Sequence, residues 1–115
     1  MCDLPQDDQL ISYRNTRSYY EEVTSLLPDV HDFYRLFEVP GLAHCRGGTG
    51  GYPTTLVDQL RGWVEEGTAP DTLPVEFKDA EGTEWKRIIC AYPQKSRYQS
   101  ECGDATKAEC WACEG

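Results

Sequence analysis

Two segments with helical periodicity enclose one segment with strand periodicity, and this order limits the fold more than any other feature of the sequence. The ranges 15–27 and 54–67 repeat apolar residues every three to four positions, as amphipathic helices do. The range 32–41 between them is an alternating run rich in aromatic residues, which predicts a strand mostly buried on both faces. A helix, a strand, a loop and a second helix in this order are typical of the end of an α/β sheet.

The ends of these segments carry residues that start and stop secondary structure. Asn15 is positioned to cap the first helix, and Gly67 follows the second helix where a glycine commonly ends one. Pro40 and Gly41 end the predicted strand, so His44 is expected in the loop just beyond its carboxyl end. Tyr19, Tyr20 and Trp63 lie on the apolar stripes and are expected in the core.

The last third of the chain contains a predicted β-hairpin and a segment without periodicity. Residues 75–77 and 85–89 alternate on either side of a Glu-Gly turn, which indicates a hairpin or two edge strands. The range 94–115 has no sustained repeat, so we expect disulfides alone to hold it in place.

Cysteine is unusually frequent, with 6 in 115 residues. Four of them, Cys90, Cys102, Cys110 and Cys113, fall within residues 90–115 and favour disulfides formed in an oxidising compartment. Zinc held by Cys102, Cys110 and Cys113 is the alternative, although a structural zinc site usually needs a second closely spaced pair. The first ten residues lack the pattern of a signal peptide, so an export signal is expected upstream of this sequence.

Length and charge exclude several classes of function. A chain of 115 residues supports one hydrophobic core, and we expect a single domain portion over residues 1–115. The net charge of -9 repels phosphate groups and argues against nucleic acid and anionic membrane surfaces as partners. No apolar run is long enough to cross a bilayer.

His44 is the first candidate for a catalytic residue, because a histidine just beyond a strand can act as the general base of a hydrolase triad. The base needs a carboxylate on its second ring nitrogen, and Asp7 and Asp8 supply candidates. In α/β hydrolases the acid follows one strand and the histidine ends the next, with a helix between them. The separation of 36 residues (44 minus 8) agrees with that order.

The nucleophile of such a triad is not evident in the sequence. No G-x-S-x-G motif occurs, and the five serines lack the strand, sharp turn and helix that a nucleophilic serine requires. In the chain order Ser, Asp, His, the serine would lie upstream of residue 1.

Several motifs together resemble the C-terminal part of the tannase and feruloyl esterase family of secreted carboxylic ester hydrolases. They are "DQLIS" followed by "YYEEV", "VPGLAHCRGGTGGYP", "LVDQLRGWVEEGTAPDTL" and "RIICAYPQKSRYQSECGD". The resemblance covers roughly residues 7–113, and it implies the α/β-hydrolase fold. It also implies hydrolysis of small esters of aromatic acids such as ferulic or gallic acid, without a cofactor.

The resemblance assigns roles to individual residues. Asp8 matches the family's triad aspartate and His44 its catalytic histidine. Cys45 matches a cysteine that forms a disulfide with a cysteine beside the nucleophilic serine, and neither that serine nor that cysteine is in this sequence. The family's calcium-binding lid is also absent from it, so no metal ligand is assigned. The isolated chain is therefore expected to be inactive.

The resemblance also predicts disulfides in the tail. Cys90 and Cys113 match the pair that links the family's C-terminal segment, and Cys102 and Cys110 are expected to form an additional bridge. Each bridge is expected to stabilise the fold by ~2 to 4 kcal/mol. A secreted, disulfide-rich binding module without catalysis is the alternative function.

Overall fold

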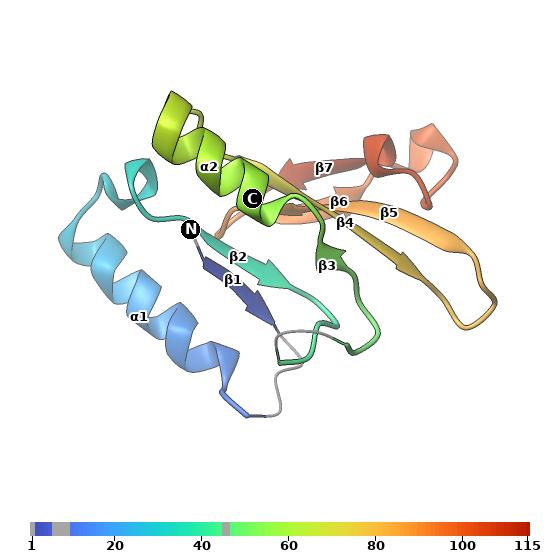
Figure 1. The fold of residues 1–115 in the computed structure, drawn as a ribbon, viewed down its shortest axis with the longest axis horizontal. Helices are drawn as coiled ribbons and strands as arrows, with labels where there is room; N and C mark the ends of the chain where they lie inside the picture. The colour runs from blue at the N-terminus through green and yellow to red at the C-terminus, as the bar shows by residue number, and fades with distance from the viewer. Residues whose placement is uncertain (1, 6–9, 45–46) are drawn as a thin grey trace.

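The computed structural model describes residues 2–5, 10–44 and 47–115. The strands are β1 (Cys2–Pro5), β2 (Leu36–Val39), β3 (Tyr52–Pro53), β4 (Thr72–Lys78), β5 (Glu84–Cys90), β6 (Lys95–Tyr98) and β7 (Trp111–Glu114). The α-helices are α1 (Tyr13–Leu26) and α2 (Leu56–Glu66), and short 3-10 helices cover Val30–Asp32, Ser100–Cys102 and Ala108–Cys110. The result is a mixed helix and strand fold with small sheets (Figure 1).

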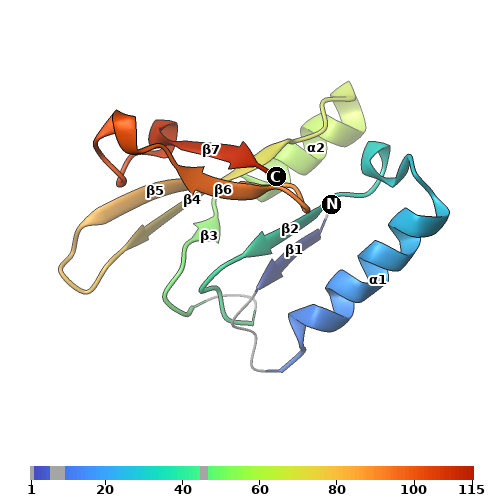
Figure 2. The ribbon, with the colours of Figure 1, turned by 180° about the vertical axis from the view of Figure 1, so that it is seen from behind.

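β1 and β2 form a parallel pair, with Cys2 opposite Leu36 and Pro5 opposite Val39. Parallel neighbours cannot be joined by a tight turn, and the connection here runs through α1. The carboxyl ends of both strands therefore lie at the same edge. Figures 1 and 2 show α1 and α2 on opposite sides of this pair.

α1 packs against β2 through an aromatic cluster and an ion pair. Tyr20 is buried with Leu36, and its ring meets the edge of the Tyr34 ring at 5.0 Å between centroids. Arg17 Nε and Nη2 donate to the two carboxylate oxygens of Glu38 in β2, at 2.5 and 2.6 Å. A two-point contact of this kind fixes orientation as well as distance, so α1 is held in one position along the strand.

The hairpin predicted from the sequence is present and somewhat longer than expected. β4 and β5 pair antiparallel from Thr72 opposite Cys90 to Lys78 opposite Glu84, and β3 adds to the free edge of β4. The chain leaving β5 then reaches β2, where the Tyr92 amide donates to the Leu36 carbonyl at 2.7 Å. The main core lies where β2 meets this sheet and contains Phe37, Val39, Leu42, Leu73, Val75, Ile89 and Ala91.

The tail has a sheet of its own, which corrects the expectation that disulfides alone hold it. β6 and β7 pair antiparallel, and the Cys90–Cys113 bridge joins the end of β5 to β7. The predicted Cys102–Cys110 bridge is also formed. Both predicted tail disulfides are therefore confirmed.

The predicted strand over 32–41 begins later than expected. The Phe33 and Tyr34 amides both donate to the Val30 carbonyl, at 3.1 and 2.7 Å, and this bonding turns the backbone before β2. Phe33 is consequently 56% exposed. The first helix begins at Tyr13, ahead of Asn15, so the predicted cap at Asn15 is wrong and Ser12 takes the N-cap position.

The apolar stripes of the helices are less buried than their periodicity predicts. Tyr19 in α1 is 61% exposed and Val64 in α2 is 78% exposed, whereas Tyr20 is buried as expected. Trp63 is only half-buried, with the Arg35 guanidinium 5.5 Å from its ring centroid. None of the described helices is long and apolar enough to cross a membrane.

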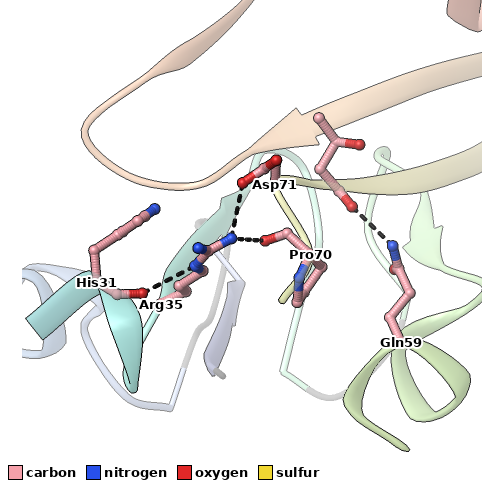
Figure 3. A network of polar contacts seen from close by, with 6 residues as sticks. His31, Arg35, Gln59, Pro70 and Asp71 are labelled. Atoms are coloured by element: carbon pink, nitrogen blue, oxygen red, sulfur yellow. Dashed lines mark hydrogen bonds and ion pairs between the residues drawn. The ribbon is translucent and has the colours of Figure 1, made fainter. Parts of the chain in front are cut away.

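Arg35 links the segment before β2 to the segment after α2 by hydrogen bonds (Figure 3). Its Nε donates to the His31 carbonyl at 3.0 Å. Its Nη1 donates to the Pro70 carbonyl at 2.7 Å and to Asp71 at 2.8 Å. Gln59 of α2 donates to the Thr72 carbonyl beside this network at 3.0 Å. These bonds hold the start of β2, and His44 lies in the loop after the other end of that strand.

Candidate active site

His44 lies in the loop just beyond the carboxyl end of β2, as predicted from the sequence. β2 ends at Val39, and Gly41 turns the chain with a φ of 76°, a conformation that favours glycine. The Ala43 amide donates to the Gly47 carbonyl at 3.1 Å, which closes the loop around His44. The His44 side chain is half-buried.

Close backbone contacts explain why this loop is rich in glycine. The Gly41 carbonyl accepts from the Thr49 and Gly50 amides at 2.8 and 2.9 Å, so the two arms of the loop lie against each other. A Cβ on Gly50 would stand 2.0 Å from the Pro40 carbonyl oxygen, and one on Gly48 would stand 2.1 Å from the Gly41 carbonyl oxygen. Both positions therefore exclude a side chain, and the loop is a compact turn.

Leu42 fixes the loop to the core. Its side chain is 1% exposed and belongs to the same cluster as Phe37 and Val39 of β2. Because Leu42 is two residues before His44, the position of the histidine depends directly on this packing.

The other two predicted residues of this region, Asp8 and Cys45, lie outside the described residues. Asp8 follows the end of β1 by three positions in the sequence (8 minus 5), and His44 follows the end of β2 by five (44 minus 39). The strands themselves end opposite each other, at Pro5 and Val39.

Comparison with known proteins identifies the family. Residues 4–114 match the family described as tannase and feruloyl esterase. The chain belongs to the tannase and feruloyl esterase family. A probable feruloyl esterase B-1 of Aspergillus flavus is 32% identical over 127 residues, which covers 92% of this chain and 24% of that protein. A mono(2-hydroxyethyl) terephthalate hydrolase of Piscinibacter sakaiensis is 38% identical over 112 residues, which covers 92% of this chain and 18% of that protein.

Solved structures agree with this family membership. The crystal structure of feruloyl esterase B from Aspergillus oryzae superimposes with a TM-score of 0.83 and 26% identity, over 97% of this chain and 26% of that chain. The fold of a tannin acyl hydrolase from Aspergillus niger also matches, with a TM-score of 0.76 and 23% identity over 98% of this chain and 22% of that chain. The chain thus spans between 18% and 26% of the length of these proteins.

The disulfides of this family member remove the zinc alternative. Cys102 is bonded to Cys110 and Cys113 to Cys90, so none of the three cysteines proposed as ligands has a free thiolate. Among the residues that the structure describes, no group of three or more histidine, cysteine or acidic side chains could hold a metal ion.

A charged cluster lies beside the carboxyl end of β2. The hydrogen bond to Glu38 raises the pKa of the Arg17 guanidinium, which also lies 5.1 Å from the Tyr13 ring centroid and 5.7 Å from that of Tyr92. Tyr92 in turn donates a hydrogen bond to Glu21. This cluster links α1 to the segment after β5, and it therefore supports the strand that leads to His44.

Sequence reasoning missed Arg87 and Ser96, which line a cavity beside the glycine loop. A signal for Arg87 was present, because strand alternation places it on the same face as Trp85 and Ile89. A charge between two inward-facing apolar residues is unusual.

Substituting alanine for Gly50 is expected to disturb the loop that carries His44. Its Cβ would meet the Pro40 carbonyl, and relieving that contact must move backbone atoms. We expect a loss of about 1 to 3 kcal/mol in the free energy of unfolding, typical of overpacking. Chemical denaturation measures this loss.

Gly62→Ala in α2 is the matched control, because nothing lies within 4 Å of the added Cβ. Replacing a helical glycine by alanine should stabilise the protein by up to ~1 kcal/mol. A Gly50→Ala protein that is as stable as the parent would contradict the close approach in the loop.

Proposed function

We propose that this chain supplies the general base and the orienting carboxylate of a serine carboxylic ester hydrolase with the α/β-hydrolase fold. The observation that carries the proposal is the parallel pairing of β1 and β2. Both strands end at one edge, after Pro5 and after Val39, and Asp8 and His44 follow these ends in the sequence. Membership in the tannase and feruloyl esterase family supports the same reaction.

In this proposal His44 moves protons and Asp8 orients it. A serine hydroxyl attacks the ester carbonyl while His44 accepts its proton, and His44 then returns that proton to the leaving alcohol. Water then attacks the acyl-enzyme while His44 accepts a proton from it, and His44 returns this proton to the serine oxygen as the carboxylic acid is released. Asp8 accepts a hydrogen bond from the other ring nitrogen, which fixes the tautomer and stabilises the imidazolium.

The nucleophilic serine is proposed to lie outside these 115 residues, together with a cysteine that pairs with Cys45. A covalent bridge next to both catalytic residues would limit their relative movement, and misplacement by about 1 Å can cost about 100-fold in rate. The 115 residues would then form the C-terminal portion of a catalytic domain. By themselves they are expected to show no turnover, because no acyl-enzyme can form.

The proposed substrates are small esters of hydroxylated aromatic acids, such as ferulic or gallic acid. Support comes from the relatives, which carry the names feruloyl esterase and tannin acyl hydrolase. The two disulfides support a site of action outside the cell, because such bridges persist in oxidising compartments.

Asp8→Asn tests the assignment of the acid. In the enzyme that contains this chain, the substitution should lower kcat by about 10⁴-fold, because an amide favours the wrong histidine tautomer. Asp7→Asn distinguishes the two neighbouring carboxylates and should change kcat by no more than a few-fold. Initial rates on methyl ferulate at saturating substrate provide the measurement. Equal losses in both variants, or a loss only at Asp7, would reject Asp8 as the orienting carboxylate.

A further inference from the structure

One arginine lies on the inward face of the β4–β5 hairpin. Arg87 is opposite Val75 in the register, and strand alternation puts it on the same face as Ile89. Val75 and Ile89 are both buried in the main core. Arg87 therefore places a positive charge next to the apolar core.

Aromatic rings surround this guanidinium. Its central carbon is 4.5 Å from the ring centroid of Trp111, 5.0 Å from that of Trp85 and 5.3 Å from that of Phe77. Rings interact with the flat face of a guanidinium. Aromatic rings are weak hydrogen-bond acceptors, so ring contacts do not satisfy the N–H donors in the guanidinium plane.

Arg87 has no anionic partner within the described part of the chain. Its Nε is buried without a hydrogen-bond acceptor, and no ion pair or hydrogen bond to its Nη groups is formed there. The Arg87 side chain as a whole is only half-buried, so part of it is accessible. Burial lowers the pKa of the guanidinium, and no carboxylate of the described residues counteracts this effect. A buried donor without a partner is costly, which favours a site that binds an acceptor.

A cavity of about 360 Å³ gives access to this group. Its walls include Arg87, Ser96, Trp111 and the two arms of the glycine loop, 39–41 and 49–51. Arg87 is the only charged side chain among the described residues that line it. The Ser96 hydroxyl is likewise buried without a partner, and rotation about its side-chain torsion offers a second donor.

We propose that Arg87 and Ser96 bind a small aromatic carboxylate in this cavity. A carboxylate matches the paired N–H donors in the guanidinium plane, and the rings of Trp111 and Phe77, which line the cavity, provide apolar contact for an attached aromatic ring. The site does not depend on the role of His44, because its polar groups are the side chains of Arg87 in β5 and Ser96 in β6 and His44 does not line the cavity. It can therefore be tested by binding alone.

Titration of the protein with sodium benzoate, followed by proton–nitrogen correlation spectra of the arginine Nε–H groups, tests the proposal. We expect the position of one Nε–H signal to change with benzoate concentration until it reaches a plateau. Sodium chloride at the same ionic strength should not change its position. The signal is assigned by its absence in Arg87→Lys. If a carboxylate side chain from outside these residues already occupied the site, no shift would occur, and the proposal would be wrong.

Matched variants separate the site from general surface charge. By isothermal titration, Arg87→Lys should weaken benzoate binding by at least about tenfold, because lysine lacks the planar pair of donors. Ser96→Ala should weaken it by about 2- to 10-fold. Arg97→Lys alters an exposed arginine of β6 that pairs with Glu114 at 3.3 Å, and it should have no effect. Equal affinity in Arg87→Lys and Arg97→Lys would overturn the proposal.

Discussion

Replacing His44 by alanine is expected to lower kcat for ester hydrolysis by at least ~10⁴-fold in the enzyme that contains this chain. The reason is the proposed role of its imidazole, which removes the proton from the nucleophile and later returns it to the leaving alcohol. Without this base the serine hydroxyl is a weak nucleophile at neutral pH. Release of ferulate from methyl ferulate, measured by chromatography, reports the rate.

His31→Ala is the matched control, since the chain has only these two histidines. His31 lies in the 3-10 helix Val30–Asp32, before β2, whereas His44 follows the other end of that strand. Burial lowers the pKa of His31, with a further contribution from Arg35. The bond from Arg35 goes to the His31 carbonyl, which alanine retains. We therefore expect kcat to change by no more than a few-fold.

Folding must be measured in both variants, because a lost fold would also abolish activity. The His44 side chain is only half-buried, so His44→Ala should melt close to the parent protein. A folded His44→Ala protein with nearly full activity would show that another residue acts as the base.

Leu42→Ala is expected to have the largest effect on stability among the residues of the loop. Leu42 is 1% exposed and packs into the main core, so its truncation leaves a cavity. Substitutions of this kind lower the free energy of unfolding by ~2 to 5 kcal/mol. Urea denaturation followed by circular dichroism measures the loss as a lower midpoint at an unchanged slope.

The effect should extend to catalysis. Leu42 is two residues before His44, and the glycine contacts alone do not anchor the loop to the core. In the proposed enzyme that contains this chain, we expect kcat to fall even under conditions in which Leu42→Ala remains folded. A loss of stability without any change in kcat would show that the position of His44 is set independently of this packing.

Leu26→Ala is the corresponding control for stability. Leu26 is the last residue of α1 and is 74% exposed, so its truncation removes little buried surface. The expected change is within ~0.5 kcal/mol. A larger loss at Leu26 than at Leu42 would indicate that the helix surface, and not the loop, dominates stability.

Local patterns account for most of the secondary structure. α2 ends at Glu66, and Gly67 caps it with a φ of 73°, as expected for a glycine after a helix. The β4–β5 hairpin follows from strand alternation on either side of a turn. β1 was not predicted, because its four residues are too few for a periodic signal and its pairing with β2 is a long-range contact. β6 and β7 escaped prediction for the same reason.

Burial was harder to predict than secondary structure. The periodicity of α1 places both Tyr19 and Tyr20 near its apolar stripe, yet Tyr20 is buried and Tyr19 is exposed. Sequence periodicity gives the apolar face of a helix but not which part of that face another element covers. The packing partner Leu36 comes from a strand 16 positions away (36 minus 20), and only the folded chain brings it to Tyr20.

The sequence by itself determined the helices, the hairpin and the loop position of His44, because these depend on residues that are close together in the chain. Its motifs also determined the family. Only the tertiary structure decided that β1 and β2 run parallel, that the two arms of the glycine loop meet, and that Arg87 lies among three aromatic rings. Each of these features depends on packing and hydrogen bonding between residues that are not adjacent in the chain, and these contacts select a single arrangement.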